Sequence, residues 1–117
     1  GADIITGPTI ESVEWRVRQR YILVVLYYST NGEQWKNQYG YLDATKHECD
    51  WDAGMRNNGW KSIDCVSPEK REVVLINLWQ NDLRGTIPEE LASLDLATID
   101  FLTNHLEGTI PKEIYTL

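Results

Sequence analysis

The stretch Val73–Leu94 reads VVLINLWQNDLRGTIPEELASL, and 23 positions later Leu96–Leu117 reads LATIDFLTNHLEGTIPKEIYTL. Nine of the 22 aligned pairs are identical. The pairs that change while staying apolar are Val73/Leu96, Leu78/Phe101 and Leu91/Ile114. The two stretches therefore share a set of apolar positions together with an Asn, a Gly and a Pro, which indicates a structural unit that is repeated and stacked.

Each copy predicts a short strand that ends in a turn. The apolar residues that alternate with polar or exposed ones are Ile76 and Leu78 in the first copy, and Ile99 and Phe101 in the second. Alternation of this kind is typical of a half-buried strand. Asn81 and Asn104 follow where the chain bends, and an amide there can bond backbone groups that the strand ladder leaves unpaired.

A tight turn and an extended limb complete each copy. Gly85 and Gly108 allow the turn, because glycine adopts backbone angles that other residues avoid. Pro88 and Pro111 keep the returning limb extended, since the residue before a proline avoids the helix. The sequence thus predicts an α/β solenoid of leucine-rich repeats with short parallel strands. The predicted repeats span residues 73–95 and 96–117.

The residues before the repeats predict an N-terminal cap. Residues 1–9 are interpreted as an extended arm, and residues 10–72 as the cap, with a helix at 10–28 and an irregular loop at 33–68. The helix is predicted from an apolar stripe at steps of three and four residues, formed by Ile10, Val13, Val17, Tyr21, Val24 and Tyr28. We expect this helix to cap the repeats; the alternative is an amphipathic helix that binds a partner.

The loop carries three tryptophans, Trp35, Trp51 and Trp60. Large rings spaced through a loop usually pin it to a core, because each ring buries a large apolar area. The loop is therefore expected to be ordered, with short antiparallel strands near residues 60–66 and 72–76.

Cys49 and Cys65 are the two cysteines of the chain. Joined in a disulfide, they would close a loop whose denatured-state entropy is worth about 3 kcal/mol. A disulfide would also place the chain outside the reducing cytosol. Unpaired, they would be two thiols of the core, and the two residues alone leave both possibilities open.

The charge balance argues against two classes of partner. Lys and Arg number 11 and Asp and Glu 18, so the net charge is -7. Nucleic acids and anionic membranes both attract cationic surfaces, which this composition does not favour. The longest apolar run, Tyr21–Tyr28, is far shorter than the roughly 20 residues that span a bilayer.

Two segments resemble a known family. The run Leu83-x-Gly85-Thr86-Ile87-Pro88, with its copy from Leu106 to Pro111, resembles the plant-specific subclass of leucine-rich repeats, which is marked by Leu-x-Gly-x-Ile-Pro. The helix followed by Cys49-Asp50-Trp51 and Ile63-Asp64-Cys65 is similar to the N-terminal cap of that subclass, which favours the disulfide. The run Tyr28–Trp35 looks like the cap of algal members, and the resemblance as a whole covers residues 12–117.

The chain departs from the family's pattern in two ways. Its repeat has one residue fewer than the family usually has, and only two repeats precede the apolar residue Leu117, at which the chain stops. A solenoid usually needs at least three repeats. We therefore expect the chain to be an excerpt of a longer protein, or a partner to cover the open end near Leu117.

The resemblance also implies where a partner would bind. In such a repeat, the strand residues outside the core face the concave side, where the family binds its partners. These residues are Leu75, Asn77 and Trp79 in the first repeat, and Thr98, Asp100 and Leu102 in the second. An exposed Trp79 beside Leu102 would form a binding hot spot; the alternative is that Trp79 packs under the cap.

A group of titratable residues surrounds Cys49. Its members are Asp43, His47, Glu48, Asp50 and Asp52. Their spacing does not fit a calcium-binding loop. We therefore interpret the group as a solvated acidic loop and predict no metal site.

Catalysis is not expected from this sequence. A hydrolase would need a nucleophile and a base held together, such as Ser29 or Ser62 with His47 and Asp50, and nothing in their spacing supports that arrangement. The other histidine, His105, follows Asn104 and is expected to face solvent in a turn.

The sequence as a whole favours a non-catalytic module for protein interaction or scaffolding. No cofactor is predicted, and the location is expected to be extracytoplasmic: secreted, at the cell surface or in an organelle lumen. One alternative is a structural subunit locked into a larger assembly. The other is a carbohydrate-binding module, suggested by the many Trp and Tyr residues, in which Trp79 or Trp35 would contact the glycan.

Overall fold

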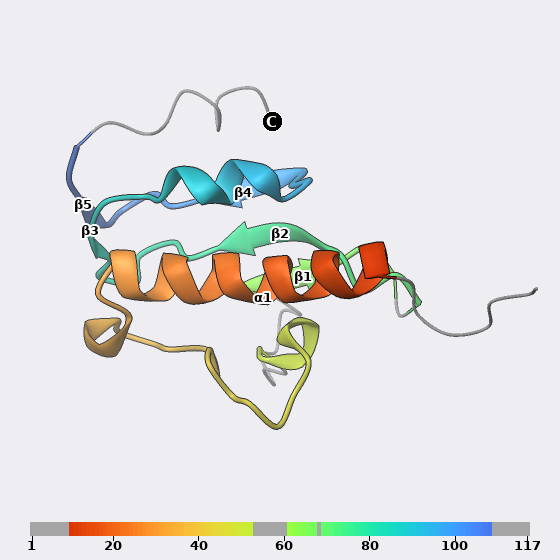
Figure 1. Ribbon diagram of the computed structural model, residues 1–117. Coiled ribbons are helices and arrows are strands. Elements are labelled where there is room, and N and C mark those ends of the chain that lie inside the picture. Colours follow the sequence, from red (N-terminus) through yellow and green to blue (C-terminus); the bar gives the residue numbers. More distant parts are fainter. Residues whose placement is uncertain (1–9, 53–60, 68, 109–117) are drawn as a thin grey trace, which may run out of the picture.

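A computed structural model describes residues 10–52, 61–67 and 69–108, and the side chains from residue 14 onwards (Figure 1). The helices are α1 (Ile10–Ser29), η1 (Gly32–Gln34), η2 (Glu48–Asp50) and η3 (Glu89–Ser93), the last three being 3-10 helices. The strands are β1 (Ile63–Cys65), β2 (Val73–Asn77), β3 (Arg84–Gly85), β4 (Thr98–Asp100) and β5 (His105–Leu106). The predicted arm 1–9, Trp60, and the end of the second repeat with Pro111 and Leu117 lie outside the described residues.

The three longer strands form one sheet in the order β1, β2, β4. The predicted antiparallel pair is confirmed, since β1 runs antiparallel to β2 and pairs Ile63 with Ile76. On its other side β2 runs parallel to β4 and pairs Ile76 with Ile99. The two copies found in the sequence therefore lie side by side at the same 23-position offset, and α1 runs alongside them (Figure 1).

The second pair of strands does not keep that offset. β3 and β5 are parallel, but Arg84 pairs with His105 and Gly85 with Leu106, which is an offset of 21 positions. Gly85 and Gly108, aligned in the sequence, are consequently not paired across the two copies. The repeat is regular at β2 and β4 and irregular in the turn that follows.

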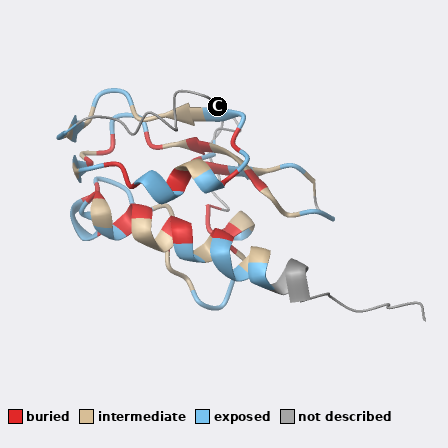
Figure 2. Ribbon diagram, turned by 45° about the horizontal axis from the view of Figure 1, so that its top comes forward, coloured by how far each residue is buried: buried red, intermediate tan, exposed pale blue. Residues whose placement is uncertain are grey.

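α1 has nearly the predicted bounds, but the predicted apolar stripe is not its buried face. Val17 is 65% exposed, Tyr21 59% and Tyr28 60%. The residues that α1 buries are Gln19, Ile22, Leu23, Leu26 and Tyr27, and Figure 2 shows buried and exposed positions on opposite sides of the helix. Every residue from Tyr21 to Tyr28 is apolar, so a stripe of apolar residues at steps of three and four exists on both sides of the helix. Tertiary packing decides which side is buried.

A cluster of aromatic rings fixes the loop that follows α1. Trp35 lies 5.1 Å from the ring of Tyr27 and 5.0 Å from that of Tyr41. The ring of Tyr41 in turn lies 5.4 Å from that of Trp51. Trp35 and Trp51 are both buried, which confirms that they pin the loop to the core. Their indole N–H groups donate to the backbone oxygens of Thr30 and Asp43.

The C-terminal end of α1 is held by β3. The N–H of Arg84 donates to the carbonyl of Thr30 at 3.1 Å, and the N–H of Thr86 donates to that of Ser29 at 3.3 Å. The last carbonyls of a helix have no partner within the helix, so β3 satisfies them. Gly85 lies between the two donors, at the point where β3 meets the end of α1.

Candidate functional site

Six residues of β2, β4 and the positions just after them form a surface that we name the β2–β4 face. Its members are Leu75, Asn77, Trp79, Thr98, Asp100 and Leu102. Strand pairing sets Leu75 beside Thr98 and Asn77 beside Asp100. Beyond the strands, the N–H of Gln80 donates to the carbonyl of Leu102 at 3.0 Å. The six residues predicted for partner contact are therefore brought together as three neighbouring pairs.

Trp79 and Leu102 are the open apolar pair of this face. Trp79 is 48% exposed and Leu102 is 70% exposed. Trp79 is therefore not enclosed in the core. Tryptophan is among the residue types enriched at interface hot spots, and Leu102 extends the exposed apolar area beside it.

A side-chain oxygen two residues earlier in the chain holds the backbone at both Trp79 and Leu102. The Asn77 side-chain oxygen accepts from the N–H of Trp79 at 3.1 Å, and the Asp100 carboxylate accepts from the N–H of Leu102 at 3.0 Å. Such local bonds hold a turn in one conformation. The two apolar side chains are consequently presented from a fixed backbone.

The predicted turn asparagines bond to backbone groups of the preceding coil. Asn104 accepts from the N–H groups of Asn81 and Leu83 and donates to the carbonyl of Leu78. Asn81 makes the corresponding bonds to Asn37 of the cap, accepting from its N–H and donating to its carbonyl, each at 2.8 Å. The loop after α1 and the two sequence copies are thus linked in series.

A hollow of about 480 Å³ lies next to these asparagines. Its lining includes Lys36, Gln80, Asp82 and Thr103. The ring of His105, exposed as predicted, also lines it and has its Nε2 3.2 Å from a carboxylate oxygen of Asp82. The hollow continues the β2–β4 face with polar and charged groups.

The group of acidic residues near Cys49 is not the solvated loop that we predicted. Glu48 and Asp52 are buried. Asp50 is exposed but lies 2.5 Å from a guanidinium nitrogen of Arg71. Asp43 accepts from both the N–H and the hydroxyl of Thr45. The prediction was wrong for Glu48, because charges counted along the chain do not show partners such as Arg16 and Gln19, which lie 32 and 29 positions away.

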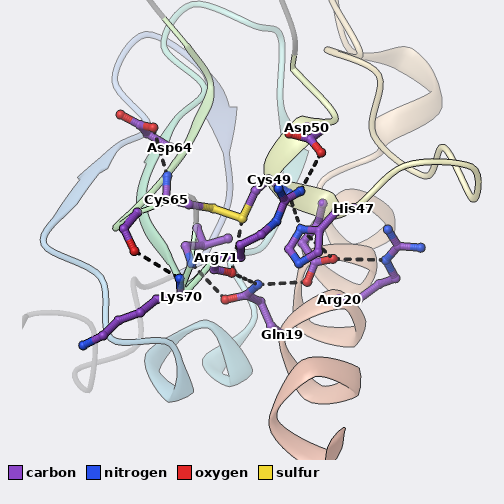
Figure 3. The surroundings of a disulfide bond; sticks show 12 residues. Gln19, Arg20, His47, Cys49, Asp50, Asp64, Cys65, Lys70 and Arg71 are labelled. Carbon is purple, nitrogen blue, oxygen red and sulfur yellow. Dashed lines mark hydrogen bonds and ion pairs between the residues drawn. A yellow bond between two sulfur atoms is a disulfide. The ribbon is translucent and has the colours of Figure 1, made fainter. Parts of the chain in front are cut away.

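Glu48 is the centre of a buried polar network, and Figure 3 shows Gln19, Arg20 and His47, three residues that surround it. Its carboxylate lies 2.5 Å from Arg16, accepts from Gln19 at 2.8 Å and lies 3.4 Å from Nε of Arg20. Burial alone would raise the pKa of Glu48, but the hydrogen bond from Gln19 and the charge of Arg16 hold it below the ordinary value. A buried carboxylate is tolerated when it is paired and hydrogen-bonded in this way.

Gln19 joins this network to the sheet. Its side-chain oxygen accepts from the N–H of Val73 at 2.9 Å, and its amide donates to the carbonyl of Arg71 at 3.0 Å. Sequence reasoning missed this residue. The available signal was its spacing, because Gln19 stands three and four positions before the buried Ile22 and Leu23.

The disulfide joins Cys49 in η2 to Cys65 at the end of β1, with the two Cα atoms 6.0 Å apart. Figure 3 shows it beside Arg71, with Gln19 and His47 nearby. The bond thus closes the irregular loop over the start of the sheet, on the side of β2 that is away from β4.

The residues considered for a hydrolase are not assembled in the described part of the chain. His47 Nδ1 accepts from the N–H of Cys49 at 3.0 Å, and no hydrogen bond joins this ring to Ser29 or Ser62 within residues 10–52, 61–67 and 69–108. Ser62 is buried, and its N–H donates to Asp52.

The described residues contain no group of three or more His, Cys, Asp or Glu side chains that could hold a metal ion. They also contain no helix with the length and apolar character that a membrane span needs.

Comparison with known proteins shows a likeness of fold. No protein-family model matches the chain, and no curated protein matches it. Six chains of solved structures match. One belongs to the crystal structure of PEPR1–AtPEP1, a plant leucine-rich repeat receptor, with a TM-score of 0.58 and 19% sequence identity. The match covers 82% of this chain and 12% of that one, so the chain spans a small part of the neighbour's length. The class that emerges is a leucine-rich-repeat-like fold.

Proposed function

We propose that this chain is the cap and first two repeats of a plant-type leucine-rich repeat solenoid, with a cap of the algal kind, and that it is a non-catalytic protein-interaction module. The Leu-x-Gly-x-Ile-Pro run beginning at Leu83 and the paired Cys49 and Cys65 support the subclass. The leucine-rich-repeat-like fold supports an interaction module. The β2–β4 face, as the concave side of the solenoid, would bind the partner.

One observation carries this proposal: Trp79 and Leu102 are exposed side chains on a fixed backbone. A backbone that is already held in one conformation loses less conformational freedom when a partner binds. Tryptophan is also among the residues that contribute most at protein interfaces. The neighbouring charges of Asp100 and of the hollow near Asp82 would orient the partner.

The Cys49–Cys65 disulfide supports an extracytoplasmic location, because such bonds persist in oxidising compartments. A glycan-binding role receives less support. Trp35, one of the two tryptophans considered for glycan contact, is buried among Tyr27 and Tyr41 and cannot stack on a sugar.

A peptide-display selection tests the proposed face. Peptides are selected on the intact chain and then measured against Trp79→Ala and Tyr28→Ala, which remove exposed aromatic rings from different surfaces. We expect Trp79→Ala to weaken binding at least about tenfold, a loss of about 1.4 kcal/mol, and Tyr28→Ala to leave it unchanged. Circular dichroism of both variants checks that they remain folded. Selected peptides that bind Trp79→Ala as well as the parent chain would reject the face.

A further inference from the structure

A cleft of about 520 Å³ lies between α1 and the segment before η2, away from the β2–β4 face. The described residues that line it carry three cationic groups, Arg16, Arg20 and Lys46, and no carboxylate. Val17 and Tyr21, from the exposed side of α1, form its apolar wall. This combination of cations and open apolar side chains is unusual on a chain whose net charge is -7.

The guanidinium groups of Arg16 and Arg20 are held in place by Glu48, on the buried side of the cleft. Glu48, fully buried, lies within ion-pair distance of both Arg16 and Arg20. Arg20 also lies 5.0 Å from the centre of the Trp51 ring and donates to the carbonyl of Lys46. Their orientation is thus largely fixed before any ligand arrives, which reduces the entropy lost on binding.

Both arginines keep hydrogen-bonding capacity that faces the cleft. Their side chains are 40% exposed for Arg16 and 33% exposed for Arg20. A guanidinium has five N–H donors, more than Glu48 and the Lys46 carbonyl occupy. These free donors match the oxygens of a carboxylate, which arginine binds in a two-point geometry.

The local charge remains positive after the nearby carboxylates are counted. Arg16, Arg20 and Lys46 contribute three positive charges, while Glu48 and the exposed Asp43 contribute two negative ones. Asp50 is paired with Arg71 and does not alter this balance. Burial lowers the pKa of His47, so its ring is largely neutral at pH 7.

We propose that this cleft binds an acidic peptide segment, with carboxylates on Arg16, Arg20 and Lys46 and a neighbouring apolar side chain on Val17 and Tyr21. Charge complementarity favours an anionic partner, and the open apolar wall favours one that carries apolar side chains. A nucleic acid fits less well, because it needs many phosphate contacts and the rest of the chain is acidic.

Fluorescence anisotropy with a labelled peptide of alternating Glu and Leu tests the proposal, and the same peptide with Gln for Glu is its control. We expect the Glu peptide to bind at least about tenfold tighter, and to bind less tightly as sodium chloride is raised. Lys46→Ala and Tyr21→Ala are each expected to weaken binding about fivefold. Neither side chain holds Glu48, so both variants should fold.

Arg18→Ala is the matched control, because Arg18 is exposed on the same helix and does not line the cleft. Equal binding of the Glu and Gln peptides, or an equal loss with Arg18→Ala and Lys46→Ala, would overturn the proposal. So would self-association that Lys46→Ala abolishes without any peptide binding, since it would assign the cleft to a second copy of the chain. Binding that persists in Trp79→Ala separates this cleft from the β2–β4 face.

Discussion

The side-chain oxygen of Asn104 accepts a hydrogen bond from the backbone N–H of Asn81, 3.0 Å away and 23 positions earlier in the chain. The same oxygen accepts from the N–H of Leu83 at 2.9 Å. The amide donates to the carbonyls of Leu78 and Phe101, at 2.8 and 2.9 Å. One side chain therefore bonds backbone groups on two adjacent coils and holds the second repeat against the first.

Replacing Asn104 with Ala is expected to lower the free energy of unfolding by about 2 kcal/mol, because the backbone groups that it bonds lose their partner. Urea denaturation followed by tryptophan fluorescence measures the change. Asn77→Ala is the control, since the Asn77 side chain accepts from the N–H of Trp79 on the surface and makes no other hydrogen bond within the described residues, and we expect a loss of about 0.5 kcal/mol or less. Equal losses in the two variants would contradict a special role for Asn104.

Gly85 and Gly108 occupy aligned positions in the repeats but should differ in their tolerance of alanine. Both have positive φ, 95° at Gly85 and 71° at Gly108. A methyl group on Gly85 would overlap the carbonyl oxygen of Ser29, whereas among the described residues a methyl group on Gly108 would meet the methyl of Thr86, at 3.4 Å. The first substitution therefore adds a steric clash to the strain that both share.

We expect Gly108→Ala to cost about 1 kcal/mol, from the strained backbone alone, and Gly85→Ala to cost about 3 kcal/mol or more, because β3 must also move away from the end of α1. Thermal unfolding of both variants gives the comparison. A Gly85→Ala protein as stable as Gly108→Ala would mean that β3 does not pack tightly on α1 in solution.

The repeat was predictable from the sequence because local pattern and tertiary position agree there. The 23-position offset between the two copies predicts the observed pairing of Ile76 with Ile99, since the apolar positions must be buried in both copies. The offset of 21 at Gly85 and Leu106 was not predictable. It depends on how the turn after each strand packs, and the two sequences align through that turn without a gap.

The cap was less predictable, because its partners are distant in sequence. Glu48 pairs with Arg16, 32 positions away, and Gln19 accepts a hydrogen bond from Val73, 54 positions away. A reading of local charge could only describe Glu48 as part of an acidic loop. The exposed stripe at Val17 and Tyr21 was misassigned for a related reason, since the helix is apolar on both sides and only its neighbours decide which side is buried.

Gln19 provides a direct test of how the cap is joined to the repeats. Its side chain satisfies the N–H of Val73, the carbonyl of Arg71 and the carboxylate of Glu48. Gln19→Ala should lower the free energy of unfolding by about 3 kcal/mol, because all three groups are left short of a partner. Gln34→Ala removes an exposed glutamine and should change it by about 0.5 kcal/mol or less. A Gln19→Ala protein as stable as Gln34→Ala would rule out this linking role.

The stability of the cap should depend on pH through His47 and Glu48. Burial lowers the pKa of His47 below its ordinary value of about 6.5. Burial would raise the pKa of Glu48, but Gln19 and Arg16 hold it below its ordinary value of about 4.3. Because each pKa is lowered in the folded state, the unfolded state binds more protons as pH falls. Each contribution is complete above the ordinary pKa and is lost as pH falls towards the folded one.

The free energy of unfolding should therefore decrease in two steps on acidification, first below about pH 6.5 and again below about pH 4.3. Urea denaturation at a series of pH values measures both steps. His47→Asn keeps an acceptor near the Cys49 N–H and should remove the first step, whereas Glu48→Gln should reduce the second. Part of the second step will remain, because hydrogen bonds from Thr45 and Arg71 lower the pKa values of the exposed Asp43 and Asp50. Stability that stays constant from pH 7 to 5 in the parent chain would show that the partly buried surroundings of His47 do not lower its pKa.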